Sequence, residues 1–145
     1  SLSGSVICSK YFGNEMAKKN GGIILNIASD LSIISPDQRL YILKNFKKSP
    51  VKPISYSVTK HGIIGLTKYL ATYWSDRNIR CNALAPGGIN SDQPKAFKRK
   101  LSKLIPLGRM AHKKEYKETI LFMISDASSY MNGFTMVVDG GRTIW

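Results

Sequence analysis

A tyrosine and a lysine four positions apart, Tyr56 and Lys60, are the residues of this sequence best suited to acid–base chemistry. On a helix, this spacing places both side chains on one face, within about 6 Å of each other. A nearby ammonium favours the phenolate form of tyrosine, which helps a phenol to exchange protons near neutral pH. The spacing alone is weak support, because seven Tyr and 22 Lys plus Arg produce about one such pair by chance. Taken alone, the pair is better explained as part of an amphipathic helix surface.

A serine and a glycine-containing turn each follow a stretch typical of a buried strand. Residues 22–28 form an almost wholly apolar run after two glycines, a pattern that predicts a strand buried on both faces, and Ser29 comes directly after it. Residues 80–85 are similar and are followed by residues 86–90. In open parallel sheets, ligands bind beyond the carboxyl ends of strands, so both segments lie where a site is expected. A lone serine there more often caps a turn, and Pro-Gly-Gly is often only a turn.

Strand and helix patterns alternate along the whole chain. Amphipathic spacing predicts helices over residues 6–18, 55–76, 93–104 and 115–123, with a short helical piece at 39–44. Strands are expected at residues 22–28, 80–85 and 134–138. This order predicts an α/β layer architecture with a parallel sheet and right-handed crossovers.

The formal net charge of +13 is unevenly distributed. Such a field attracts phosphates on nucleic acids, on membrane surfaces or on small substrates, and composition does not choose among them. No nucleic-acid-binding motif is recognisable, and no apolar run approaches the roughly 20 residues that span a bilayer. Eight basic residues and no acidic one lie between Pro94 and Lys114, namely Lys95, Lys98, Arg99, Lys100, Lys103, Arg109, Lys113 and Lys114.

Four motifs occur in a fixed order along the chain. They are Asn26-Ile27-Ala28-Ser29, Tyr56-Ser57-Val58-Thr59-Lys60, Asn82-Ala83-Leu84-Ala85-Pro86-Gly87-Gly88-Ile89 and Val138-Asp139-Gly140-Gly141. With them, the chain resembles the classical short-chain dehydrogenase/reductases over essentially all 145 residues. Four ordered motifs are far more specific than any one of them. The resemblance implies the C-terminal half of a doubly wound, Rossmann-like parallel sheet with flanking helices. It also implies hydride transfer between NAD or NADP and a carbonyl or alcohol.

The resemblance also assigns roles to individual residues. Tyr56 is the implied general acid/base, Ser29 hydrogen-bonds the same substrate oxygen, and Lys60 assists Tyr56 and contacts the nicotinamide ribose. The backbone from Pro86 to Ile89 is implied to hold the nicotinamide. With Tyr56 and Lys60, the implied cofactor-binding set is Asn26, Pro86, Gly87, Gly88, Ile89 and Ser91.

The sequence departs from the family pattern in three ways. The glycine-rich phosphate-binding loop and the residue that selects between NAD and NADP are not found, so we expect one partial domain over residues 1–145 that lacks the cofactor half. The catalytic Asn of the family is matched by Ser1, so a proton relay through that position is not expected. Ser29 and Tyr56 are 27 positions apart, longer than usual, which predicts an insertion over residues 31–53 next to the active site.

Two segments bear on the substrate. Residues 35–41 are similar to reductases of bacterial flagellin and surface-sugar modification. The basic segment 92–114 corresponds to the part of the family that covers the substrate, so it is expected to be a lid, and it favours an anionic sugar or acyl substrate. The equally good alternative is that a lysine-rich helix is only a solvated face.

The remaining expectations concern partners and location. Helices 6–18 and 57–74 resemble the pair through which the family forms homodimers or homotetramers. We expect a cytoplasmic protein without nucleic-acid or membrane partners. The cysteines and histidines have no metal-type spacing, so no metal is expected. The alternative function, motivated by the missing phosphate loop, is a catalytically incomplete remnant that serves as an interaction or oligomerisation module.

Overall fold

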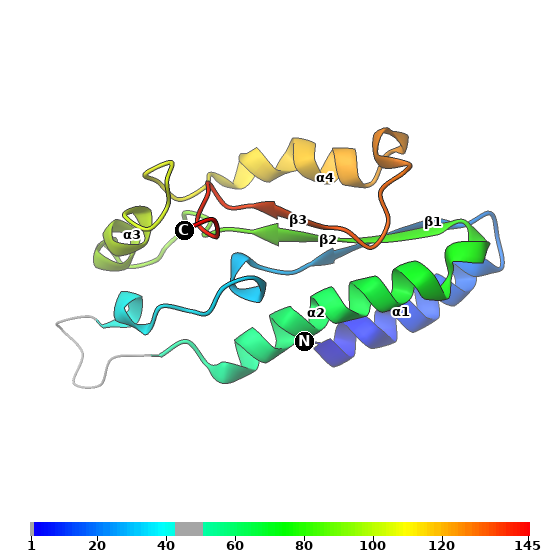
Figure 1. Ribbon diagram of the computed structural model, residues 1–145, viewed down its shortest axis with the longest axis horizontal. Helices are drawn as coiled ribbons and strands as arrows, with labels where there is room; N and C mark the ends of the chain where they lie inside the picture. The colour runs from blue at the N-terminus through cyan, green and yellow to red at the C-terminus, as the bar shows by residue number, and fades with distance from the viewer. Residues whose placement is uncertain (1, 43–50) are drawn as a thin grey trace.

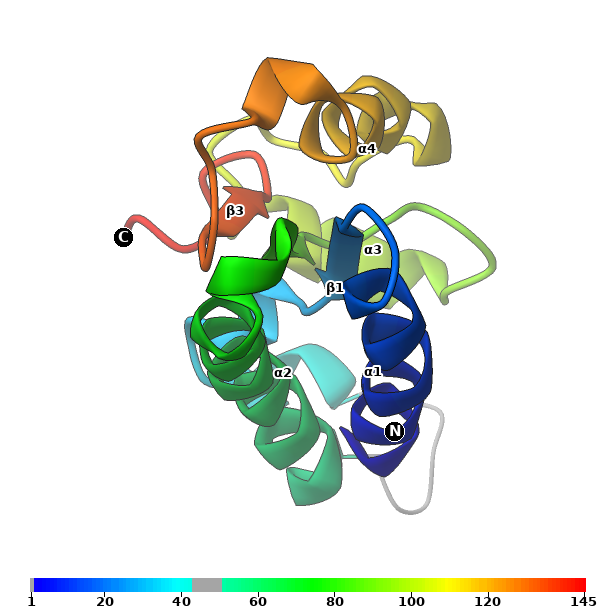
Figure 2. The ribbon, with the colours of Figure 1, turned by 90° about the vertical axis from the view of Figure 1, so that its right-hand side faces the viewer.

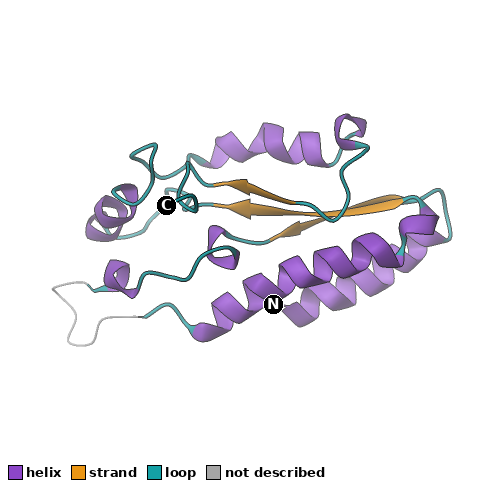
Figure 3. Ribbon diagram, viewed as in Figure 1, coloured by secondary structure: helices purple, strands orange, loops and turns teal. Residues whose placement is uncertain are grey.

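A computed structural model describes residues 2–42 and 51–145, and it contains a three-stranded parallel sheet (Figures 1 and 3). The strands are β1 (Gly22–Ile27), β2 (Ile79–Pro86) and β3 (Thr135–Val138), in the order β1-β2-β3. Gly22 pairs with Ile79 and Ile27 with Leu84 along the β1–β2 ladder. The α/β fold class expected from the sequence is confirmed.

Helices cover both faces of this sheet. Helices α1 (Leu2–Ala17) and α2 (Ile54–Tyr73) lie side by side on one face, and α4 (Lys117–Met123) lies on the other (Figure 2). Helix α3 (Lys95–Ser102) lies at the end of the sheet toward which all three strands point (Figure 1). No helix in the described part of the chain is both long enough and apolar enough to cross a membrane.

Short 3₁₀ helices complete the chain where the sequence suggested irregular or purely α-helical structure. The helix expected at 115–123 begins with a 3₁₀ turn, and His112 and Glu115 form a reciprocal capping box at its start. The short helical piece expected at 39–44 is a 3₁₀ helix that ends at Tyr41, and residues 43–50 lie outside the described residues. The 3₁₀ helices are η1 (Asp30–Ser32), η2 (Gln38–Tyr41), η3 (Ser75–Arg77), η4 (Lys113–Tyr116) and η5 (Asp126–Ser128).

The central strand β2 is the most buried element of the fold. Cys81, Ala83 and Ala85 are wholly buried, and burial raises the pKa of the Cys81 thiol to about 12. The expectation that β1 is buried on both faces is wrong for the described chain. β1 is the edge strand, with only β2 paired to it among the described strands, and it is mostly half-buried, with Ile27 46% exposed.

Helices α1 and α2 approach the sheet closely around one aromatic side chain. Trp74 is 6% exposed and packs with Leu70, Ile79 and Cys81. A Cβ atom built on Gly13 of α1 would lie 2.1 Å from Cη2 of the Trp74 ring. Only glycine therefore allows α1 to lie flat against the indole.

Replacing Gly13 by alanine should lower the free energy of unfolding by about 1–3 kcal/mol, because the new methyl group overpacks the core against Trp74. Denaturant unfolding measures this cost. In a Trp74→Leu background the same replacement should cost much less, because the ring carbons that it strikes are gone. Equal costs in the two backgrounds would contradict this account of the packing.

Candidate active site

A cavity of about 690 Å³ opens beyond the carboxyl ends of β1 and β2. Its size is typical of sites for small organic ligands. The site residues implied by the sequence motifs meet here from three separate parts of the chain, with Asn26 the exception. Those that line the cavity are Ser29, Tyr56, Lys60, Pro86, Gly87, Gly88, Ile89 and Ser91.

Ser29 is fixed at the point where β1 ends. The backbone N–H of Ala28 donates to the carbonyl of Leu84 at 2.7 Å, which extends the strand pairing up to the serine. Ser29 is 5% exposed, and its hydroxyl donates to Oδ1 of Asp30 at 2.9 Å and accepts from the Leu31 N–H at 3.2 Å. The serine thus caps the 3₁₀ helix η1, in agreement with the alternative that a serine at this place caps a turn. It also lines the cavity.

Tyr56 and Lys60 come from the first two turns of α2. The Lys60 Nζ donates to the carbonyl of Ile27 at 2.7 Å, and it lies 5.9 Å from the centroid of the Tyr56 ring. Lys52 brings a second ammonium, whose Nζ lies 3.5 Å from the same centroid. Burial lowers the pKa of Lys60, and the positive charge of Lys52 lowers it further. The ammonium groups of Lys52 and Lys60 therefore both lie within 6 Å of the Tyr56 ring centroid.

The loop that follows β2 is held by backbone contacts on both sides. The Gly87 N–H donates to the Val138 carbonyl at 2.9 Å, and the hydroxyl of Tyr116 donates to the same carbonyl at 3.1 Å. The Ala111 N–H donates to the Gly88 carbonyl at 2.9 Å. A Cβ atom on Gly87 would lie 2.7 Å from Cα of Asp139, so a side chain there would push the loop from the sheet. This loop is a rigid wall of the cavity.

Asn26 does not join the other predicted residues. It is 8% exposed, and its amide donates to Oγ1 of Thr67 at 3.0 Å and to Sγ of Cys81 at 3.6 Å. These bonds tie β1 to α2 and β2 beneath the cavity. Ser1, matched to the catalytic Asn of the family, lies outside the described residues.

Described residues of the expected insertion, within 31–42 and 51–53, and residues of the segment 92–114 also line the cavity. Leu40 and Tyr41 of η2 pack with Phe97 and Leu101 of α3. The Nζ of Lys100 donates to the carbonyls of Arg39 and Ile42, at 2.8 and 2.7 Å, so at least one lysine of the basic segment has a structural contact. The Gln38 side chain exchanges two hydrogen bonds with the Lys52 backbone, which holds both described ends of the insertion together.

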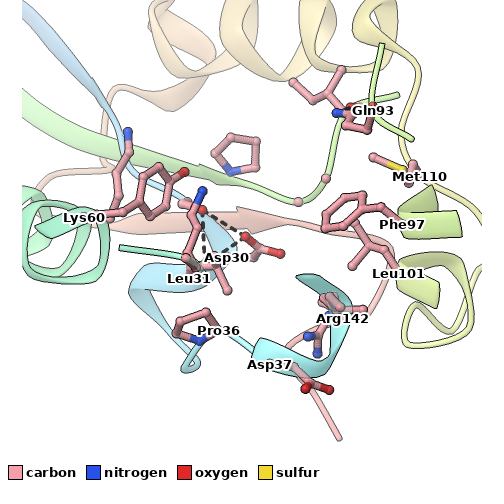
Figure 4. A pocket seen from close by; sticks show the side chains of 18 of the residues that line it. Asp30, Leu31, Pro36, Asp37, Lys60, Gln93, Phe97, Leu101, Met110 and Arg142 are labelled. Carbon is pink, nitrogen blue, oxygen red and sulfur yellow. Dashed lines mark hydrogen bonds between the residues drawn. The ribbon is translucent and has the colours of Figure 1, made fainter. Parts of the chain in front are cut away.

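Four charged residues of the cavity were not predicted as site residues from the sequence. Asp30, Asp37, Lys52 and Arg142 line it together with the predicted residues. Figure 4 labels Asp30, Asp37 and Arg142. Asp30 follows Ser29 directly, so its position was a usable signal. Burial raises the pKa of Asp30, against the opposing effect of its hydrogen bond from Ser29. Arg142 directly follows the fourth motif, to which no site residue was assigned, and only the fold brings it to the cavity.

Within residues 2–42 and 51–145, no three His, Cys, Asp or Glu side chains are grouped to hold a metal ion. The acidic group nearest Ser29 is Asp30, and its Oδ1 is occupied by hydrogen bonds from Ser29 and Leu31.

A parallel α/β sheet with a cavity at its strand ends defines the class of doubly wound ligand-binding proteins. Residues 1–143 match the family model described as "Enoyl-(Acyl carrier protein) reductase". The chain belongs to the short-chain dehydrogenase/reductase family, as the sequence motifs predicted.

Curated relatives show the same relationship. The chain is 32% identical to a D-threitol dehydrogenase of Mycolicibacterium smegmatis, over 99% of this chain and 52% of the relative. It is 33% identical to an NAD-dependent glycerol dehydrogenase of Listeria innocua, over 99% of this chain and 53% of the relative. The chain therefore spans about half the length of these relatives.

Solved structures agree with the fold. A short-chain dehydrogenase from Leptospira borgpetersenii with bound NAD⁺ superposes with a TM-score of 0.89 at 35% identity, covering 98% of this chain and 53% of that one. A gluconate 5-dehydrogenase from Burkholderia cenocepacia, in complex with NADP and tartrate, superposes with a TM-score of 0.81 at 28% identity. The match covers 98% of this chain and 52% of that one.

Replacing Asp30 by asparagine should raise the melting temperature at pH 7. A carboxyl group whose pKa is raised by folding stabilises the fold while protonated, and this contribution is lost as the pH rises through the folded-state pKa. Asparagine keeps the acceptor for Ser29 and Leu31 without the buried charge. Differential scanning calorimetry should show the gain at pH 7 and little of it near pH 3. Asp76→Asn, at an exposed position, is the control and should show no gain. A lower melting temperature for Asp30→Asn at pH 7 would contradict the burial argument.

Proposed function

We propose that this chain forms the catalytic and substrate-binding half of an NAD(P)-dependent oxidoreductase that interconverts an alcohol and a carbonyl by hydride transfer. The observation that carries the proposal is the single cavity that unites Ser29, Tyr56, Lys60 and the loop from Pro86 to Ile89. These residues are separated in sequence, and the parallel pairing of β1 and β2 brings their segments to one end of the sheet.

Tyr56 is the proposed general acid/base. Its hydroxyl gives a proton to the carbonyl oxygen during reduction and takes it back during oxidation. The ammonium groups of Lys52 and Lys60 lie beside its ring, with Nζ 3.5 and 5.9 Å from the ring centroid, and so place positive charge next to the group that exchanges the proton. Ser29 donates a second hydrogen bond to the same oxygen, which requires its hydroxyl to turn away from Asp30. The nicotinamide, when bound, supplies or accepts the hydride.

The residues of this chain fit the nicotinamide part of such a cofactor. The rigid loop from Pro86 to Ile89 offers backbone groups beside Tyr56, where a nicotinamide would lie. Within this chain, nothing resembles a glycine-rich pyrophosphate seat.

We propose that a nucleotide-binding half, in the same polypeptide or in another, docks along the unpaired edge of β1. A hollow of about 560 Å³ runs there between α1 and β1, and it is lined by apolar side chains that include Phe12, Met16 and Ile23. An edge strand beside an apolar hollow suits a parallel strand with its helix.

The proposed substrate is a small polyol or sugar derivative. Among the relatives are dehydrogenases of D-threitol, of glycerol and of 2-dehydro-3-deoxy-D-gluconate. An anionic sugar or acyl compound is supported by the positive charges of Lys52, Lys60 and Arg142 in the cavity lining, whereas the basic segment 92–114 contributes only uncharged residues to it, among them Gln93, Phe97 and Leu101. A role in flagellin or surface-sugar modification and a cytoplasmic location stay predictions from the sequence.

A homodimer or homotetramer is proposed through α1 and α2. Both helices expose large apolar side chains, among them Tyr11 of α1 and Val58, Tyr69 and Tyr73 of α2, all at least 57% exposed. Exposed apolar side chains gathered on neighbouring helices are typical of an interface. The same surfaces favour the alternative function, an interaction module without catalysis.

Replacing Tyr56 by phenylalanine should lower kcat of the complete protein by about 10²- to 10⁴-fold, because the proton donor is lost. NAD(P)H absorbance with D-threitol, glycerol and D-gluconate measures the rate. Tyr69→Phe, on the exposed part of the same helix, is the control and should turn over normally. Unchanged rates in Tyr56→Phe would contradict the mechanism, and the interaction module would then be the better account.

Replacing Tyr69 by aspartate should dissociate the oligomer, because a charge then enters the proposed apolar interface. Sedimentation velocity at micromolar concentration should show a smaller species than the wild type. Tyr130→Asp is the matched control, since Tyr130 is fully exposed and lies outside α1 and α2. Identical sedimentation of wild type and both variants would contradict an interface on this face.

A further inference from the structure

Arg142 is a buried cation whose side chain has no partner among the described residues. It is only 8% exposed, yet its guanidinium makes no ion pair or hydrogen bond with any residue of the described ranges 2–42 and 51–145. Only its backbone N–H is engaged, to the Asp139 carbonyl at 3.4 Å. Buried arginines are rarely left unpaired, because desolvation of an unpaired charge is costly. The side chain lines the cavity that holds Ser29 and Tyr56 (Figure 4).

The two carboxylates that share this cavity are already engaged elsewhere. Asp37 binds Arg39 through both of its oxygens, at 2.9 Å each. Asp30 accepts from the Ser29 hydroxyl and the Leu31 N–H through Oδ1. Arg142 lowers the pKa of both carboxyl groups through space, but neither lies within 4 Å of its guanidinium. Among the described residues, the N–H groups of the Arg142 guanidinium therefore have no acceptor, so they are available to bind a ligand.

The turn that carries Arg142 is rigid. The carboxylate of Asp139 accepts from the N–H groups of Gly141 and Thr143, at 2.9 and 2.8 Å. Gly140 and Gly141 both have positive φ angles, of 67° and 88°, and a Cβ atom on Gly141 would lie 2.8 Å from Pro106. The side chain is thus presented from a fixed backbone, as a preorganised binding group requires.

A planar guanidinium with free donors matches a carboxylate, which it can bind through two parallel hydrogen bonds. Asp30 and Asp37 disfavour a doubly charged phosphate in the same space, whereas a singly charged carboxylate is better tolerated. The second oxygen of Asp30 has no hydrogen-bond donor among the described residues, so it can accept from a substrate hydroxyl.

We propose that Arg142 binds the carboxylate of an open-chain hydroxy acid or oxo acid, whose reacting carbon then lies between Ser29 and Tyr56. This assignment rests on the proposed function and narrows its substrate class. Arg142 would be a specificity-determining residue, because it distinguishes a sugar acid from the corresponding neutral polyol.

Equilibrium binding to the complete protein tests this, with D-gluconate and D-glucitol as probes that differ by a carboxylate and a hydroxymethyl group. Calorimetry with cofactor present should show that the wild type binds D-gluconate about tenfold more tightly or better. Arg142→Gln should lose this preference and leave D-glucitol binding unchanged. Arg99→Gln removes an exposed arginine of α3 and should behave as wild type.

Two outcomes would overturn the assignment. One is equal binding of the two probes by the wild type, or a preference that survives in Arg142→Gln. The other is Arg142-dependent binding of D-glucitol 6-phosphate without such binding of D-gluconate, which would identify a phosphate site. Tyr56→Phe should keep the preference for D-gluconate, because binding needs no proton transfer. If the wild type prefers D-gluconate to D-glucitol but shows no turnover, the proposed function is contradicted and the assignment of Arg142 is not.

Discussion

The parallel pairing of β1 with β2 is the constraint on which the site depends. It sets the ends of both strands side by side, so that Ser29 and the loop beginning at Pro86 face one cavity. The pairing continues one residue past β1 through the bond from Ala28 to Leu84, which fixes the backbone that carries the serine. A shift of one residue in this register would reverse the face of every β1 side chain.

Helix α2 connects these strands and depends on the same register. Its Lys60 donates to the last carbonyl of β1, at Ile27, and its Thr67 accepts from Asn26 on the same strand. These two contacts set the helix along the strand and place Tyr56 in the cavity lining. Asn26 is thus understood as a residue that supports the site from beneath.

The sequence was sufficient for the sheet, the helices and most of the cavity, because strand patterns, Tyr56 with Lys60 and the Pro86 loop are local signals. It was insufficient for Arg142 and Lys52, which reach the cavity only through the turn after β3 and the clamp formed by Gln38. It also overestimated the burial of β1, since apolar composition does not show whether both edges of a strand are paired.

The central claim is that a nicotinamide cofactor binds against Tyr56, and ¹⁹F NMR of the complete protein labelled with 3-fluorotyrosine tests it without knowledge of the substrate. The Tyr56 signal is assigned by its loss in Tyr56→Phe. Addition of NAD⁺ or NADP⁺ to saturation should shift this signal, because the ring lies on the wall of the proposed site, and should leave that of the exposed Tyr130 unchanged. A Tyr56 signal that does not move at saturating cofactor would contradict the account.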